Sequence, residues 1–295
     1  MFKRVKCILS VILSELFLIS CLCGCSSFER LVTINQDEGV QGVLYHVSGS
    51  EMVVLMIGGS GPVDVDYTVS GIGLYAEMAE IFAESKISTL RLEKRSQFET
   101  IDEEYIEDGL LAIEYCKERY DHVFLLGHSL GAHVAPIFSE SVDGLVLMGG
   151  FVSEVEEVYA SQLKQNASVD QMEVIDDELN TILNLCEDTG FSWFGIRESW
   201  WLSLDELKLK SRLKGLDCPV LVVFSKDDER VHLDEYELYQ SYLSLHEDTE
   251  FELVEGVNHF FVENCSGQFR ESVVQKIATW ILKQSSVIIN VRCCE

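Results

Sequence analysis

Residues 122–141 read HVFLLGHSLGAHVAPIFSES, and this stretch decides the fold. The apolar run His122–Leu126 predicts a buried strand, and Leu130–Ser141 has the apolar spacing of a helix. Between them lies GHSLG at residues 127–131, a G-x-S-x-G pattern. A strand, a sharp turn and a helix in this order expose a serine hydroxyl above a sheet, and the glycines leave room for the turn. Ser129 is therefore the candidate nucleophile, and a purely structural turn is the alternative.

Strands and helices alternate on both sides of this turn. The other expected strands are Met52–Ile57, Ile87–Leu92, Gly144–Met148, Val220–Phe224 and Glu250–Val254. The other expected helices are Tyr75–Ser85, Tyr105–Arg119, Asp234–Leu245 and Ser272–Gln284. Strands that are apolar throughout are typical of a parallel sheet with both faces covered, so the pattern predicts an α/β fold with a mostly parallel, doubly wound sheet. Leu31–Val47 predicts an antiparallel hairpin at its edge.

One segment interrupts the alternation. Phe151–Leu213 has no strand pattern, and we expect helices there at Glu154–Asn166, Asp170–Glu187 and Arg197–Arg212. Because the segment follows a strand at the edge where open α/β sheets bind ligands, we interpret residues 151–213 as a helical cap. The core is then residues 39–150 and 214–285, with a tail at 286–295. The following aromatic residues form either an apolar roof over a substrate or the core of the cap: Phe191, Trp193, Phe194, Trp200 and Trp201.

A serine nucleophile needs a base, and the base needs a group that orients it. His259 follows the last expected strand, in a loop that can reach over Ser129. The orienting acid is expected after the strand Val220–Phe224, where Asp227 and Asp228 stand in a row of three acidic residues. We favour Asp228 and keep Asp227 as the alternative.

At this point the chain resembles an α/β-hydrolase, whose catalytic residues follow one another as Ser, Asp, His. Here that order is Ser129, Asp228 and His259, and the resemblance covers about Gly39 to Lys283. The family pattern G-x-x-D-x-x-V at the acid has Ser225 in place of its glycine. The segments GSGPVD at 59–64 and LRLEKR at 90–95 are similar to a bacterial subgroup described as serine aminopeptidase-like or as esterase. Asp66 and Arg95 near these segments either shape the cleft entrance or form a structural salt link.

The resemblance also implies an oxyanion hole made of two backbone N–H groups. One belongs to Leu130, directly after the nucleophile. The other comes from the loop GGSGP at residues 58–62, where Ser60 aligns with the usual donor and Gly59 is the alternative. A phosphate-binding P-loop is excluded because no Lys-Ser or Lys-Thr follows the glycines.

Charge narrows the possible partners. The chain has 295 residues, 47% of them hydrophobic, and carries 22 Lys and Arg against 50 Asp and Glu, a net charge of −28. A surface this acidic repels nucleic acid and anionic lipid, so we expect neither as the main partner. No His, Asp or Glu cluster has metal-ligand spacing, and we expect no cofactor.

The N-terminus is typical of a secretory signal. Lys3, Arg4 and Lys6 precede an apolar run, Ile8 to Leu22, that is short for a membrane span. The run ends in LCGC at 22–25, which resembles a bacterial lipobox. We therefore expect a signal peptide at 1–24, lipidation of Cys25, a tether at 25–38 and an extracytoplasmic protein held at the cell membrane. An uncleaved anchor and cleavage before Cys21 are the alternatives.

Together these features predict a serine hydrolase that acts through a Ser-His-Asp triad and an acyl-enzyme. A small or medium carboxylic ester is the expected substrate. A peptidase that acts on amide substrates, an acyltransferase and a non-catalytic, lipid-tethered binding module are the alternatives.

Overall fold

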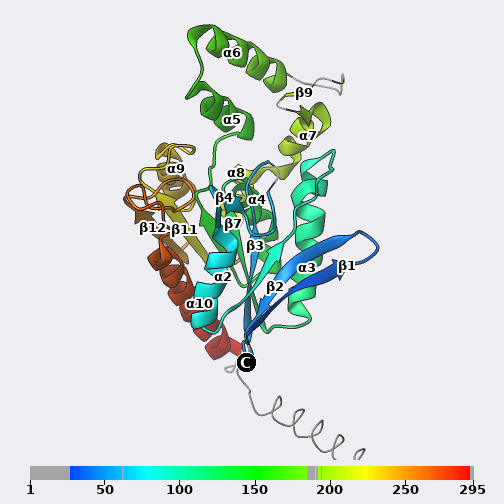
Figure 1. The fold of residues 1–295 in the computed structure, drawn as a ribbon, viewed down its shortest axis with the longest axis vertical. Helices are drawn as coiled ribbons and strands as arrows, with labels where there is room; N and C mark the ends of the chain where they lie inside the picture. The colour runs from blue at the N-terminus through cyan, green and yellow to red at the C-terminus, as the bar shows by residue number, and fades with distance from the viewer. Residues whose placement is uncertain (1–26, 62, 185–189, 191, 194, 293–295) are drawn as a thin grey trace, which may run out of the picture.

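An eight-stranded sheet forms the centre of the molecule (Figure 1). The computed structural model describes residues 27–292 except 62, 185–189, 191 and 194. In spatial order the strands are β1 (Phe28–Asn35), β2 (Val40–His46), β6 (Ser88–Leu92), β3 (Met52–Ile57), β7 (His122–His128), β8 (Gly144–Met148), β11 (Val220–Ser225) and β12 (Thr249–Val254). The last six of these are mutually parallel, whereas β1 and β2 pair antiparallel at one edge. The expected α/β sheet and its edge hairpin are confirmed.

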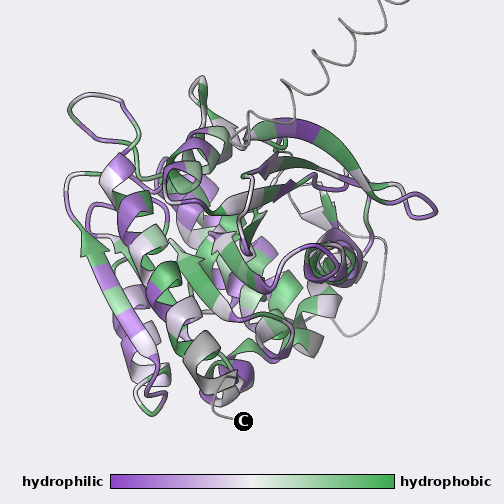
Figure 2. Cartoon of the chain, turned by 90° about the horizontal axis from the view of Figure 1, so that it is seen from below, coloured by the Kyte–Doolittle hydropathy of each residue, from purple (hydrophilic) through white to green (hydrophobic). Residues whose placement is uncertain are grey.

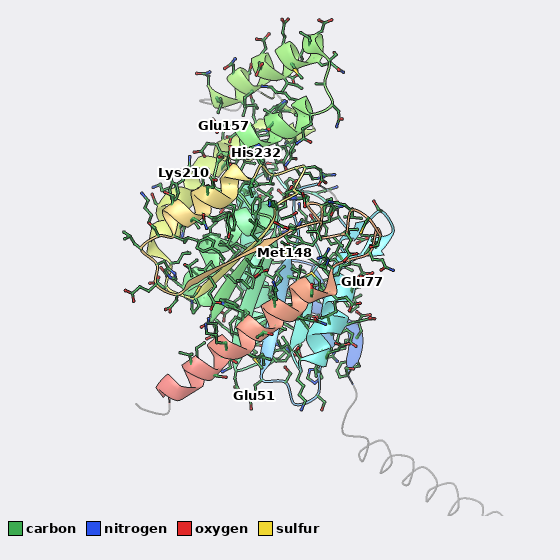
Figure 3. All side chains as sticks on the ribbon, turned by 90° about the vertical axis from the view of Figure 1, so that its left-hand side faces the viewer. Glu51, Glu77, Met148, Glu157, Lys210 and His232 are labelled. Carbon is green, nitrogen blue, oxygen red and sulfur yellow. The ribbon has the colours of Figure 1, made fainter. Side chains whose placement is uncertain are left out.

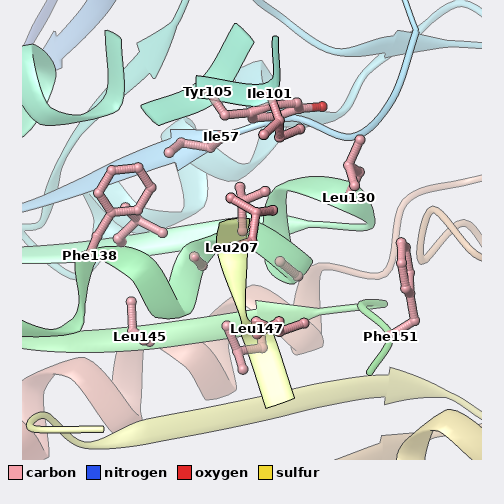
Figure 4. Close-up of a cluster of buried hydrophobic side chains, with 14 of the residues drawn as sticks. Ile57, Ile101, Tyr105, Leu130, Phe138, Leu145, Leu147, Phe151 and Leu207 are labelled. Atoms are coloured by element: carbon pink, nitrogen blue, oxygen red, sulfur yellow. The ribbon is translucent and has the colours of Figure 1, made fainter. Parts of the chain in front are cut away.

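Helices cover both faces because the strands alternate their side chains. Along β7, Val123 and Leu125 join one buried cluster, and Phe124 and Leu126 join the other. The first cluster packs under α3 (Glu107–Lys117) and α9 (Asp234–Tyr242), and the second under α2 (Leu74–Glu84) and α10 (Glu271–Arg292). Figure 2 shows apolar strands at the centre, and Figure 4 shows side chains of the first cluster packed around β7 and β8.

Two of the expected helices are not α-helical along their whole length. The helix expected from Tyr105 is preceded by a π-helical turn, η1 (Asp102–Ile106). The helix after Ser129 is α4 (Leu130–Val134), followed by the 3₁₀ segment η2 (Ala135–Ser141). Pro136 stands at the start of η2 and has no N–H to continue an α-helical ladder.

The termini differ from the expected boundaries. Strand β1 begins at Phe28 and pairs with β2, so most of the expected tether at 25–38 belongs to the edge of the sheet. Helix α10 continues to Arg292, into the expected tail at 286–295. The expected signal peptide at 1–24 and Cys25 lie outside the described residues. None of the described helices combines the length and the hydropathy needed to cross a membrane.

The cap rises above the carboxyl ends of the parallel strands. Its elements are α5 (Val155–Lys164), α6 (Val169–Leu183), the short hairpin β9 (Ser192–Trp193) and β10 (Ile196–Arg197), α7 (Glu198–Ser203), η3 (Leu204–Leu207), α8 (Leu209–Arg212) and η4 (Leu213–Gly215). The third expected helix is interrupted at Lys208, which has a positive φ of 47°. Figure 3 shows Met148, at the end of β8, between Glu157 of the cap and Glu51 at the opposite end of the sheet.

The described cap tryptophans form a packed core. Trp193, Trp200 and Trp201 are buried, and the ring of Trp201 lies 5.0 Å from that of Trp193 and 4.9 Å from that of Trp200. Their rings therefore contact one another instead of lining an open roof. Phe191 and Phe194 lie outside the described residues.

Candidate active site

Ser129 stands on a strained turn between β7 and α4. Its φ is +55° and its ψ is −121°, a conformation that side-chain-bearing residues seldom adopt. A hydrogen bond from Ser129 N to the Met148 carbonyl, 2.9 Å long, ties the turn to the end of β8. The glycines on either side are required by contact: a Cβ on Gly127 would lie 2.3 Å from the Gly131 oxygen, and one on Gly131 2.5 Å from the Ile57 oxygen.

Because the atoms around Gly131 are crowded, we expect a larger side chain there to destabilise the fold. Gly131→Ala should lower the free energy of unfolding by about 3 kcal/mol, the upper end of the cost of overpacking a core, because backbone atoms must move. Urea unfolding measures the change, and Gly215→Ala is the matched control because its Cβ meets nothing within 4 Å. Equal stability of the two variants would contradict the tight fit.

The imidazole of His259 is paired with Asp228. His259 Nδ1 lies 2.7 Å from Asp228 Oδ2, and the two side chains are 2% and 1% exposed. Asp228 Oδ1 accepts hydrogen bonds from the backbone N–H groups of Arg230 and Val231, both 2.8 Å long. Asp227 instead accepts from Gly256 N at 2.6 Å. Of the two candidate acids, Asp228 is the one in contact with His259.

His259 and Ser129 both lie near the carboxyl ends of β7 and β8. Gly149 directly follows β8, and a Cβ placed on it would lie 3.5 Å from His259 Cε1. Ser129 N donates a hydrogen bond to the carbonyl of Met148, the residue before Gly149. The rings of His259 and of His128, next to Ser129, have centroids 4.8 Å apart. Among the described residues, no hydrogen bond joins the Ser129 hydroxyl to another side chain.

A buried chain of hydrogen bonds, absent from the sequence analysis, supports the position of His259. His128 Nε2 lies 3.0 Å from the His259 carbonyl, which can only accept, so Nε2 carries the proton. Nδ1 is then the acceptor for the Tyr67 hydroxyl at 3.0 Å. Burial raises the pKa of Tyr67 to about 12, against the effect of a hydrogen bond from the Gly59 N–H. The chain thus connects the glycine-rich loop to the backbone of His259.

The loop after β3 approaches Ser129 closely. A Cβ on Gly59 would lie 2.9 Å from Ser129 Cβ, so only glycine fits there. Because the Gly59 N–H faces Tyr67, the next N–H along the loop, that of Ser60, is the better oxyanion donor of the two candidates. The hydroxyl of Tyr159, on α5 of the cap, also interacts with the Ser60 side chain. Leu130, the other expected donor, begins α4.

Comparisons with known proteins agree with this arrangement. No protein-family model matches the chain. Esterase EstD of Thermotoga maritima is 28% identical over 281 residues, which cover 86% of this chain and 68% of EstD. The structure of Est1E from Butyrivibrio proteoclasticus superposes with a TM-score of 0.60 at 15% identity, over 88% of this chain and all of Est1E. The α/β hydrolase GrgF from Penicillium sp. sh18 gives a TM-score of 0.62 at 14% identity, over 87% of this chain and 99% of GrgF.

The chain has the α/β-hydrolase fold.

Asp66 and Arg95, the two charged residues near the glycine-rich loop, are not paired with each other. Arg95 binds Asp108 through Nε at 2.9 Å and Nη2 at 2.7 Å, which anchors the residues after β6 to α3. Asp66 lies 3.4 Å from Arg91 of β6. Both contacts are structural links between neighbouring segments.

Two buried histidines make the folded protein sensitive to acid. Burial lowers the pKa of His128 to about 3 and that of His133 to about 4, from an ordinary 6.5. Since the unfolded chain binds these protons more readily than the folded protein, stability falls as the pH drops from about 6.5 toward 4.

We expect each histidine to cost on the order of 2 kcal/mol of unfolding free energy between pH 7 and pH 5. Urea unfolding of His133→Gln should show a smaller loss over this range than the wild type. His232→Gln is the control, because the His232 side chain is 79% exposed. An identical pH dependence in all three proteins would contradict the assignment.

Proposed function

We propose that this protein hydrolyses carboxylic esters through an acyl-enzyme on Ser129. His259 Nε2 takes the hydroxyl proton as Ser129 Oγ attacks the ester carbonyl carbon. The N–H groups of Leu130 and Ser60 stabilise the oxyanion, and His259 then returns the proton to the departing alcohol. Water attacks the acyl-enzyme with His259 again as base, which releases the carboxylic acid and restores Ser129. Asp228 holds Nδ1–H and stabilises the charged imidazole.

The observation that carries the proposal is the buried Asp228–His259 pair beside a serine on a strand–turn–helix elbow. Asp228 accepts hydrogen bonds from two backbone N–H groups and faces His259 Nδ1. A carboxylate accepts hydrogen bonds, so Nδ1 carries the proton and Nε2 is the acceptor. The similarity to Esterase EstD supports ester hydrolysis as the reaction.

The test combines labelling with a substrate panel. A fluorophosphonate probe should modify Ser129, as located by peptide mass spectrometry. The panel contains p-nitrophenyl acetate, p-nitrophenyl butyrate, methyl ferulate and an aminoacyl-naphthylamide. Methyl ferulate is included because ferulic acid is bound to Est1E in one of its structures. Hydrolysis of esters with no amide turnover is expected. Amide turnover alone would identify a peptidase, and a folded protein without labelling or turnover would favour a binding module.

We further propose that the protein is anchored outside the cytoplasm by a lipid on Cys25. The lipobox-like LCGC at 22–25 supports this location. Cys25→Ala should move the protein from the membrane fraction to the soluble fraction, with Cys116→Ala as a control on a buried thiol. Membrane retention of Cys25→Ala would point to an uncleaved anchor.

A further inference from the structure

Two side chains donate hydrogen bonds to the carbonyl of the peptide group that joins Gly59 to Ser60. The Gly59 carbonyl accepts hydrogen bonds from Tyr105 Oη at 2.8 Å and from Lys94 Nζ at 2.9 Å. Lys94 Nζ also lies 3.2 Å from the Gly61 carbonyl, so one ammonium group contacts the loop on both sides of Ser60. The sequence analysis assigned no role to Lys94 or Tyr105.

Lys94 is buried, and its charge is balanced. Its side chain is 9% exposed and lies 2.6 Å from the carboxylate of Glu104, which is 3% exposed. Burial lowers the pKa of Lys94, while Glu104 opposes this shift. The other carboxylate oxygen of Glu104 accepts a 2.6 Å hydrogen bond from Trp200 Nε1 of the cap. Glu104 and Tyr105 both belong to the π-helical turn η1, so this one turn supplies the ion-pair partner of Lys94 and the second donor to the Gly59 carbonyl.

Peptide geometry carries the effect from Lys94 to the oxyanion hole. In a planar trans peptide the Gly59 C=O and the Ser60 N–H belong to one rigid group and point in opposite directions. Fixing the carbonyl therefore fixes the direction of the N–H. A cation on the carbonyl also polarises the peptide, which strengthens the N–H as a donor.

We infer that Lys94 is a positioning residue that orients and polarises the Ser60 N–H, with Tyr105 as the second support of the same carbonyl. The inference rests on the proposed ester hydrolysis and extends it to residues that do not touch the substrate. It assigns the buried Lys94–Glu104 pair to transition-state stabilisation in addition to folding.

The experiment compares Tyr105→Phe and Lys94→Met with the wild-type full chain, using p-nitrophenyl acetate and a trifluoromethyl ketone. The ketone forms a hemiketal oxyanion with a serine nucleophile and therefore reports on the oxyanion hole. We expect kcat to fall about 3- to 10-fold in Tyr105→Phe and about 10- to 100-fold in Lys94→Met, below the roughly 10²–10³-fold loss caused by removing a donor. KM should change less than about 3-fold, and the affinity for the ketone should fall in parallel with kcat/KM.

Tyr120→Phe is the matched control. It also removes a tyrosine hydroxyl, here one bound to His46 Nδ1 at 3.0 Å, from the amino-terminal side of β7. Its kcat and ketone affinity should equal those of the wild type. If Lys94→Met does not fold, the double variant Lys94→Met/Glu104→Gln, which removes both charges, takes its place beside Tyr105→Phe.

The outcomes separate this inference from the proposed function. A wild type that neither hydrolyses the ester nor binds the ketone overturns both. An active wild type with kcat and ketone affinity unchanged in Tyr105→Phe and in the Lys94 variant overturns only the positioning role. A raised KM with ketone affinity unchanged would also overturn it, because the residues would then support the fold alone.

Discussion

Replacing Ser129 by Ala is expected to lower kcat/KM for p-nitrophenyl acetate by about 10⁵- to 10⁶-fold and to abolish labelling by the fluorophosphonate. The reason is that no other hydroxyl stands on the elbow beside the Asp228–His259 pair. The positive φ of Ser129 is retained by Ala at the same position, so the unfolding midpoint should stay close to that of the wild type. Steady-state kinetics and urea unfolding measure the two quantities.

Ser244→Ala is the control, because this exposed serine, two residues after α9, donates its hydroxyl to the nearby Ser241 carbonyl. Its activity should equal that of the wild type. Substantial hydrolysis by Ser129→Ala would show that another group forms the acyl-enzyme or that water attacks directly.

The second large loss of activity is expected on replacing Asp228. Asp228→Asn should lower kcat about 10⁴-fold, because the amide can match its surroundings only by reversing the imidazole. Its oxygen would accept the backbone N–H groups of Arg230 and Val231, which turns its NH₂ group toward His259. Nδ1 must then become the acceptor, Nε2 carries the proton, and His259 can no longer take the proton of Ser129.

Asp227→Asn is the matched comparison one residue away. Asp227 accepts from Gly256 N, and its replacement keeps an oxygen for that bond, so we expect less than about a 3-fold change in kcat. Measuring kcat for both variants across pH 6–9 separates the two roles. Similar losses in the two variants would contradict the assignment of Asp228.

The sequence predicts those parts of the site that rest on local pattern. The elbow is readable because Gly127, Ser129 and Gly131 form a contiguous motif whose spacing is set by backbone contact. The mostly parallel sheet follows from apolar strands that must be buried on both faces, whereas the order of the strands comes from the structure. The acid that pairs with His259 is harder to predict, because three carboxylates are neighbours in the sequence. Only the path of the loop decides which of them contacts His259.

Tyr67, Lys94 and Glu104 could not be predicted in the same way. Tyr67 contacts His128 of the elbow, Lys94 contacts the glycine-rich loop, and Glu104 contacts Lys94. These contacts form only when the chain folds. The sequence does hold one indication of Lys94: it stands two residues after the end of the buried strand Ser88–Leu92. The motif LRLEKR draws attention instead to Arg95, whose partner Asp108 lies on α3. Charge alone does not distinguish the two neighbouring cations.

The cap leaves the sheet after β8 and returns to it at β11, two strands that are hydrogen-bonded neighbours. The proposed nucleophile precedes this excursion and the proposed acid and base follow it, so the reacting groups stay on one rigid platform whatever the length of the excursion. A different helical segment can therefore be grafted between residues 152 and 213 without changing the register of the eight-stranded sheet, provided that it keeps a donor to Glu104 in place of Trp200.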